Sequence, residues 1–263
     1  MPNHQATPDR SFSSLLDIMH LLRKECPWDR KQTHASIRDL MIEEIYEAIE
    51  AIDKQDYEEL KKELGDILLH VVFHAEMAQE SQRFDIGDVI YALQDKLIRR
   101  HPHVFEQAEL KDSEAVKQSW ENIKQKENGT KGVLQGVPAQ LPGLLRAQRM
   151  QEKAGAVGFD WNTWPEAWKK LEEELGELKE VLAEKTASKA RKEDEMGDVF
   201  FSLVNVARLS GLDAETSLRG TNNKFMRRFS HIETRLREQG KRLGDVSLED
   251  LDILWDEAKE KLG

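Results

Sequence analysis

Hydrophobic residues recur at helical spacing along both halves of this chain. Proline is absent from residues 28–101 and 166–263, where apolar side chains three or four positions apart share one face of a helix. The clearest stripes are Trp168, Leu171, Leu175, Leu178 and Leu182; Met196, Phe200, Leu203 and Ala207; Met41, Ile45, Ala48 and Ile52; and Leu64, Leu68 and Val71. Because no segment of the sequence shows convincing strand alternation, the pattern predicts an all-α fold.

A segment rich in glycine and proline separates two helical blocks. Residues 127–143 hold four glycines and two prolines, which favour turns and loops over helix. We therefore expect an N-terminal helical domain over residues 11–127, a linker over 128–143 and a C-terminal helical domain over 144–263.

The two blocks repeat the same motifs in the same order. EEIYE (43–47) matches EELGE (173–177), ELGD (63–66) matches EMGD (195–198), KLIRR (96–100) matches KFMRR (224–228), and WENIK (120–124) matches WDEAK (255–259). Two copies are too few for a solenoid, so duplication of one domain is the simpler interpretation. Each copy is expected to form a bundle of four or five helices.

Paired carboxylates are the first candidate site. Glu174 and Glu177 lie three positions apart on one expected helix, and Glu195 and Asp198 repeat this spacing on the next. A short turn near residues 185–189 would make the helices antiparallel, so that the two pairs face each other. Four carboxylates at close range repel, and they suit Mg²⁺ or Mn²⁺ better than zinc. The first copy holds the equivalent set Glu44, Glu47, Glu63 and Asp66.

Other interpretations of these polar residues stay open. A solvated acidic face accounts for any single pair of glutamates, whereas a ferritin-like di-iron site would need a Glu-x-x-His motif that the sequence lacks. His70 and His74 follow Asp66 at intervals of four residues, without equivalents in the second copy. Their apolar neighbours favour a place in the core or an interface over a role as ligands.

Basic and aromatic residues supply the second candidate site. Lys224, Arg227 and Arg228 share one helical face, and such groups bind phosphate oxygens, although a solvated basic face has the same pattern. Trp255, and Trp120 in the first copy, could stack on a nucleobase or pack in the core. Acidic helices that bind a metal, with a basic helix that binds anions, suit a metal–polyphosphate complex.

Taken together, these motifs resemble those of the MazG-like all-α nucleoside triphosphate pyrophosphohydrolases. The resemblance rests on the Glu-Glu-x-x-Glu and Glu-x-x-Asp patterns, the duplication, CPWD (26–29), RRHPHVF (99–105) and GFDW (158–161). It implies two tandem MazG-like helical-bundle domains and Mg²⁺-dependent hydrolysis of ATP and other triphosphates to a monophosphate and pyrophosphate. It also implies broad base specificity, a role in nucleotide-pool control or house-cleaning, and a homodimer whose bundles are completed at the subunit interface.

The resemblance also assigns roles to residues by motif position. The implied metal ligands are Glu174, Glu177, Glu195 and Asp198. The implied nucleotide contacts are Lys170, Arg191, Lys192, Asp194, Lys224, Arg227, Arg228 and Trp255. Either Glu173 or Glu174 would orient or deprotonate the attacking water, and the sequence does not choose between them.

The surroundings of the two acidic motifs differ. Lys169 and Lys170 precede the second motif, where the first copy has Asp39 and Leu40. We therefore expect the second copy to be the main catalytic site. The first copy is then structural, weakly active or fitted to another ligand.

Net charge and composition limit the kinds of molecule that this chain is expected to bind. The chain carries a net charge of −11, of which residues 1–130 contribute −9 and residues 131–263 contribute −2, so neither nucleic acid nor a membrane is an expected partner. With one cysteine, Cys26, and no hydrophobic leader or 18-residue apolar run, a cytoplasmic enzyme is expected. The alternatives are a nucleotide-binding regulatory module without turnover and a helical scaffold with solubilising acidic faces.

Overall fold

The computed structural model describes residues 7–105, 112, 116, 119–120, 123 and 132–262. Regular elements in these residues are all helical, which confirms the all-α prediction. None of the described helices is long and apolar enough to cross a membrane. Internal contacts divide the chain into two units, Met1–Lys124 and Gln125–Gly263. The predicted linker begins at residues outside the described ranges, and its bounds stay a prediction.

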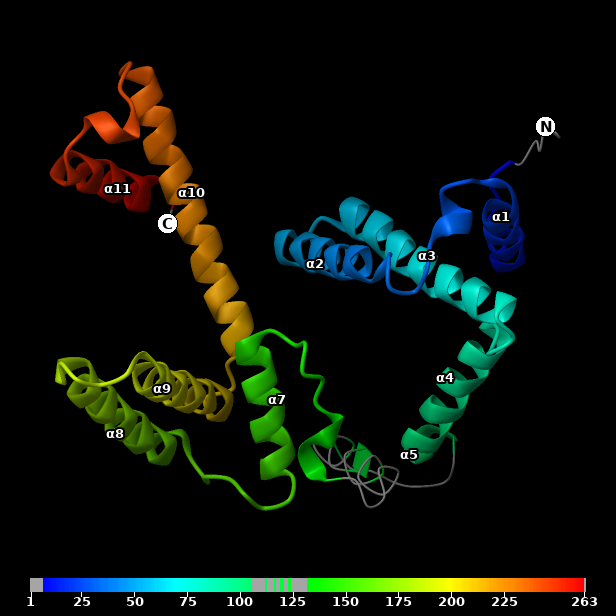
Figure 1. Cartoon of the computed structure of the whole chain (residues 1–263), viewed down its shortest axis with the longest axis horizontal. Coiled ribbons are helices and arrows are strands. Elements are labelled where there is room, and N and C mark those ends of the chain that lie inside the picture. The colour runs from blue at the N-terminus through cyan, green and yellow to red at the C-terminus, as the bar shows by residue number, and fades with distance from the viewer. Residues whose placement is uncertain are drawn as a thin grey trace. The chain divides into compact units, whose positions relative to one another are not determined.

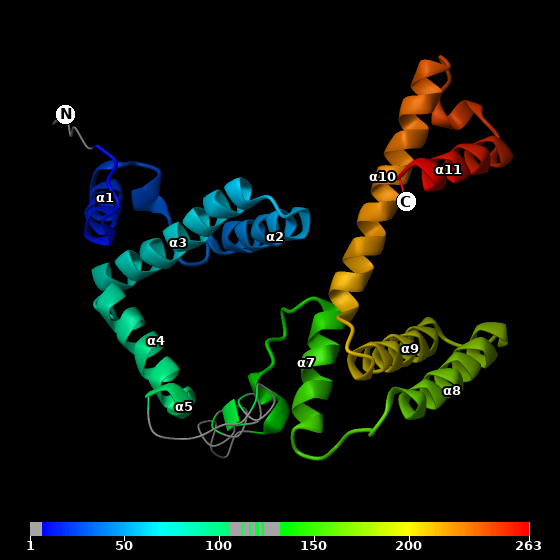
Figure 2. The same ribbon diagram turned by 180° about the vertical axis from the view of Figure 1, so that it is seen from behind.

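The first unit is built around an antiparallel pair of helices (Figures 1 and 2). Its helices are α1 (Phe12–Glu25), α2 (Arg38–Lys54), α3 (Tyr57–Glu80), α4 (Ile86–Arg100) and α5 (Pro102–Phe105), with a 3₁₀ turn, η1 (Asp29–Lys31), after α1. Met19 of α1 packs with Phe73 and Met77 of α3 in the core of this unit.

Two residues turn the chain back between α2 and α3. Gln55 takes a left-handed conformation with φ of 55°, which ends α2. Asp56 then caps α3, because its side chain accepts a 3.0 Å hydrogen bond from the Glu59 amide. The connection is short, so the acidic motifs of the two helices face each other.

The second unit contains two helical hairpins, and α7 packs against both of them where α9 leads into α10 (Figure 1). Its elements are η2 (Val133–Gly136), α7 (Gly143–Gly155), α8 (Trp164–Ala183), α9 (Lys189–Leu209), α10 (Ala214–Glu238), η3 (Leu243–Asp245) and α11 (Leu248–Leu262). Helices α8 and α9 pack around Leu171, Leu178 and Val199, as the short turn near residues 185–189 predicted. Helices α10 and α11 enclose a separate cluster that includes Ile232 and Leu254.

The α8–α9 hairpin has apolar residues on more than one face. Leu171 and Leu178 of the predicted α8 stripe are buried, but Trp168, Leu175 and Leu182 remain 43%, 47% and 55% exposed. On α9, the stripe members Phe200 and Leu203 are 52% and 48% exposed. A helix normally buries one such face, so half of the stripe lies uncovered within this chain.

An ion pair fixes the loop that enters α8. Arg208 of α9 forms a bidentate salt bridge with Asp160, in which Nη1 donates to Oδ2 at 2.9 Å and Nη2 donates to Oδ1. A Cβ atom built on Gly155, the last residue of α7, would lie 2.6 Å from Asp160 Oδ2. The absence of a side chain at Gly155 therefore leaves room for the Asp160 carboxylate to pair with Arg208.

We predict that Gly155→Ala destabilises the second unit by about 1–2 kcal/mol, because the added methyl group displaces Asp160 from Arg208. Gly220→Ala is the matched control, since nothing lies within 4 Å of the added atom. This control should stabilise α10 by about 0.5–1 kcal/mol through helix propensity. Thermal unfolding followed by circular dichroism measures both variants, and equal stabilisation by the two would contradict the prediction.

Candidate metal and nucleotide site

Three carboxylates of the second unit come together across the α8–α9 hairpin. Glu174 and Glu177 of α8 and Glu195 of α9 each offer an oxygen, and the three oxygens lie within 4.8 Å of one another. Glu174 is only 6% exposed, because it falls on the buried stripe of α8 between Leu171 and Leu178. The spacing of these three positions in the sequence already carries the signal for this burial.

Asp198 lies outside that close group but contributes to its electrostatics. Burial raises the pKa of Glu195, and the charges of Glu177 and Asp198 raise it further. Arg191 opposes this effect, although its guanidinium is paired with Glu184 at 2.7 Å. The fold therefore disfavours the negative charge that it places on Glu195.

Lys170 is tied directly to the acidic motif. Its Nζ atom lies 2.7 Å from Glu173 and 2.8 Å from Glu174. Both carboxylates raise the pKa of Lys170, so the ammonium group stays charged at neutral pH. This pair places a cation at the edge of the carboxylate cluster, where an incoming anion could reach it.

The first unit builds a similar cluster without that lysine. Oxygens of Glu44, Glu63 and Asp66 lie within 4.8 Å of one another. Burial raises the pKa of Glu63, followed by the charge of Glu47, the fourth predicted ligand. Leu40, 38% exposed, stands at the position that matches Lys170. The first cluster therefore lacks the equivalent cation.

Both clusters fit a hard divalent cation. Each consists only of carboxylate oxygens, which are the donors that Mg²⁺ and Mn²⁺ prefer. Burial raises the pKa values of Glu63 and Glu195, and the neighbouring carboxylates raise them further, so a bound cation would relieve the part that is due to charge repulsion.

The predicted basic residues lie on a different hairpin from the carboxylates. Lys224, Arg227 and Arg228 all belong to α10, and the first two are exposed. The Arg228 guanidinium lies 5.6 Å from the Trp255 ring centre, and Phe225 lies 5.2 Å from the same ring. Trp255 is half-buried against the core of α10 and α11, so part of its surface is already used in packing.

The same cation–π contact occurs in the first unit. Arg100 lies 5.3 Å from the Trp120 ring centre, at the positions that match Arg228 and Trp255. The internal repeat therefore extends from the sequence to a specific side-chain contact.

The remaining predicted contacts lie near the start of α9. Arg191 is paired with Glu184, and Lys192 is half-buried. Asp194 is exposed and directly precedes Glu195 on α9. Together with Lys170, they border the carboxylate cluster rather than the α10 triplet.

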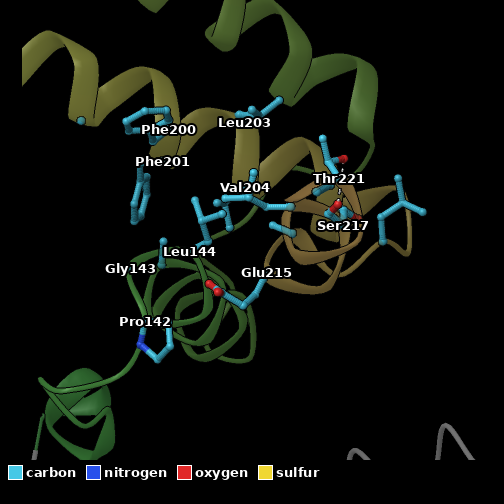
Figure 3. Close-up of a pocket in the computed structure, with 16 residues that line it drawn as sticks. Pro142, Gly143, Leu144, Phe200, Phe201, Leu203, Val204, Glu215, Ser217 and Thr221 are labelled. Carbon is cyan, nitrogen blue, oxygen red and sulfur yellow. Dashed lines mark hydrogen bonds between the residues drawn. The ribbon is translucent and has the colours of Figure 1, made fainter. Parts of the chain in front are cut away.

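An apolar groove lies where α7, α9 and α10 meet (Figure 3). It has a volume of about 860 Å³, and Leu144, Phe200, Leu203 and Leu218 are among its lining residues. Two buried glutamines hold its walls together, since Gln151 donates to the Phe201 carbonyl at 2.8 Å and Gln148 accepts from the Ala214 amide at 3.4 Å.

Duplicated helical hairpins that each carry a carboxylate cluster place this chain among the all-α nucleotide pyrophosphohydrolases. The chain belongs to the MazG family, since the model of the MazG nucleotide pyrophosphohydrolase domain matches residues 32–105 and 165–233. These two matches contain the two carboxylate clusters.

Proteins with curated names show the same relationship over almost the whole chain. A nucleoside triphosphate pyrophosphohydrolase of Escherichia coli is 42% identical over 94% of this chain and 96% of its own length. Nucleoside triphosphate pyrophosphohydrolase/pyrophosphatase MazG of Thermotoga maritima is 44% identical over 94% of this chain and 95% of its own. Bacillus subtilis YabN is 45% identical over 95% of this chain and 52% of its own length.

We predict that Mg²⁺ stabilises the chain and that Glu195→Gln weakens this effect. At a Mg²⁺ concentration 100-fold above its dissociation constant, one site contributes about 2.7 kcal/mol to the free energy of unfolding. Without metal, Glu195→Gln should melt above the wild type, because the fold disfavours the charge that the substitution removes. Melting temperatures in chelator and in MgCl₂ measure both effects.

The matched control is Glu180→Gln, an exposed position of α8 outside the cluster. It should leave the Mg²⁺ response unchanged. An equal Mg²⁺ response in Glu195→Gln and Glu180→Gln would argue against cation binding by this cluster.

Proposed function

We propose that this chain hydrolyses nucleoside triphosphates between the α and β phosphates, releasing a monophosphate and pyrophosphate, with the second unit as the main site. The observation that carries the proposal is the Glu174–Glu177–Glu195 cluster beside the charged Lys170, in a chain of the MazG family. The curated names of the Escherichia coli and Thermotoga maritima relatives support this activity.

Mg²⁺ is the proposed cofactor, and Mn²⁺ could replace it. Glu174, Glu177, Glu195 and Asp198 would hold it, and the same role in the first unit falls to Glu44, Glu47, Glu63 and Asp66. When bound, such a cation neutralises phosphate charge and lowers the pKa of a coordinated water.

The residues around the cluster would position the triphosphate. Lys170 presents a permanent positive charge to phosphate oxygens and is oriented by Glu173 and Glu174. Of these two glutamates, Glu173 is the exposed one and lies outside the close group of oxygens. Because Glu174 would hold the cation, we assign the orientation or deprotonation of water to Glu173, which also pairs with Lys170.

The basic helix α10 would supply further phosphate contacts. We assign this role to Lys224, Arg227 and Arg228, and base stacking to the uncovered part of Trp255. Arg191, Lys192 and Asp194 would contact the nucleotide from the start of α9. Broad base specificity and a role in nucleotide-pool control are part of the proposal, because stacking and phosphate contacts do not read the base edge.

A homodimer in the cytoplasm completes the proposal. The uncovered apolar face of the α8–α9 hairpin and the groove beside α10 are surfaces that a second copy could bury. Nucleic acid and membranes are not proposed as partners of this acidic chain.

The activity is tested by product identification with purified protein, Mg²⁺ and a panel of triphosphates. Phosphorus NMR should show a monophosphate and pyrophosphate, whereas diphosphate and phosphate would identify an ordinary ATPase. Binding of triphosphate with no product would instead support a regulatory module without turnover.

We predict that Glu174→Gln and Asp198→Asn each lower Mg²⁺-dependent pyrophosphate release by about 100-fold or more, because each removes a ligand oxygen charge. Glu44→Gln, the equivalent change in the first unit, should spare most of the activity. Initial rates measure the effect, and circular dichroism confirms folding. Equal losses from the two sets would show that the second unit is not the main site.

We predict that the purified chain sediments as a dimer and that Leu203→Glu converts it to a monomer, because a charge in the apolar groove opposes burial. Leu248→Glu is the matched control, since Leu248 is 70% exposed on α11 and does not line the groove. Sedimentation velocity distinguishes the two species. A monomeric wild type, or a dimeric Leu203→Glu variant, would contradict the predicted interface.

A further inference from the structure

Three histidines gather in the first unit, beyond the end of its carboxylate cluster. His34 lies in the segment before α2, whereas His70 and His74 lie one turn apart on α3. Their side chains come from positions 36 and 40 residues apart, so local spacing could not reveal the group. Sequence reasoning favoured a core or interface role for His70 and His74, and it did not consider His34 with them.

Two of the imidazoles direct the same nitrogen toward each other. The Nδ1 atoms of His34 and His74 are 2.7 Å apart, and their rings are parallel within 5° at a centroid distance of 5.0 Å. One of these nitrogens must carry a proton and the other a lone pair, unless a cation takes the place of the proton.

The third imidazole brings an unsatisfied nitrogen. His70 is 7% exposed, and its Nδ1 atom is buried without a hydrogen-bond partner. Buried polar atoms are normally paired, so an orphaned ring nitrogen calls for an explanation. The centre of the His70 ring lies 6.3 Å from the centre of the His74 ring, so the three imidazoles are neighbours.

The hairpin itself does not require these side chains. The second unit builds the matching α8–α9 hairpin with Ser202 and Val206 at the positions that correspond to His70 and His74. The hairpin can therefore fold without histidines at these positions, so the three imidazoles of the first unit are not needed to form it.

The His34–His74 pair has the spacing of a hydrogen bond, which a bound ion would widen. With metal–nitrogen bonds of about 2.0–2.1 Å, two ligands of a tetrahedral ion lie about 3.3 Å apart, with ring centres about 5 Å apart. The His34 and His74 Nδ1 atoms are closer than this, at 2.7 Å, so the two rings would have to separate, and the His70 ring approach them, for an ion to bind. Among the described residues only the two carboxylate clusters have three donor atoms within 4.8 Å, so the three imidazoles are not drawn together around one point in this structure.

The electrostatic surroundings also suit a metal. Burial lowers the pKa of His74, and the neighbouring His34 and His70 lower it further. Ring nitrogens with lone pairs are the form that binds a cation. His34 is exposed while His70 is buried, so an ion could enter from solvent at His34 and reach His70 below.

We propose that His34, His70 and His74 bind Zn²⁺ as a structural ion, separate from the Mg²⁺ of the carboxylate cluster. Three imidazoles without a carboxylate select a borderline transition metal over Mg²⁺. The ion would link the segment before α2 to α3. Helix α2 carries Glu44, and α3 carries Glu63 and Asp66. This inference goes beyond the proposed hydrolysis and does not depend on it.

The test is zinc titration of the full chain after chelator treatment, with no nucleotide present. Excess MgCl₂ occupies the carboxylate clusters, and calorimetry with ZnCl₂ then reports the remaining site. We expect one Zn²⁺ per chain, with affinity lowered at least about tenfold in His34→Gln and in His74→Gln. Co²⁺ added instead should show the visible absorption of four-coordinate ligation in the wild type but not in His34→Gln or His74→Gln.

His20→Gln and Cys26→Ser are the matched controls. His20 is an exposed histidine of α1 that hydrogen-bonds Glu76, and Cys26 is a free thiol in the same unit. Both variants should bind Zn²⁺ as the wild type does. Because His34 is exposed, His34→Gln should keep the fold, which circular dichroism checks. The proposal is overturned if no Mg²⁺-resistant Zn²⁺ binding occurs, or if His34→Gln and His74→Gln bind normally, which would leave a hydrogen-bonded pair only.

Discussion

Repulsion between carboxylates inside a helical hairpin is the constraint on which the rest of this structure depends. Glu174 and Glu63 are each buried on the inward face of a hairpin, among other acidic side chains. Without a counter-charge this arrangement raises the free energy of the folded chain, and the apolar contacts along each hairpin must offset it. A scaffold that tolerates such burial is already organised to receive a cation together with its anionic ligand.

The two units share one helical scaffold but differ in the residues around their carboxylate clusters. Both units repeat the hairpin, the carboxylate group and the arginine–tryptophan contact of Arg228 with Trp255 and Arg100 with Trp120. They differ in the charges around these shared parts, because Lys170 pairs with Glu174 where the first unit has Leu40. The first unit instead adds three histidines. One fold therefore places its two carboxylate clusters in different surroundings by changing a few neighbouring residues.

The α8–α9 hairpin also has an apolar face that the described part of the chain leaves uncovered. Helix α8 buries Leu171 and Leu178 within its unit but leaves Leu175 and Leu182 about half exposed. A hairpin that is apolar on two faces can bury the outer face against another surface. The carboxylates and the basic face of α10 lie on different hairpins of one chain, so packing between copies would also affect how the site is assembled.

The sequence by itself determined the helices, the duplication and the pairing of acidic motifs across each hairpin, because these follow from periodicity and short connections. Only the tertiary structure decided which oxygens meet, that Glu174 is buried and that Arg191 pairs with Glu184. It also decided that His34 reaches His74 across 40 residues. These features depend on side-chain rotamers and on packing between separate elements, and neither leaves a regular spacing in the chain.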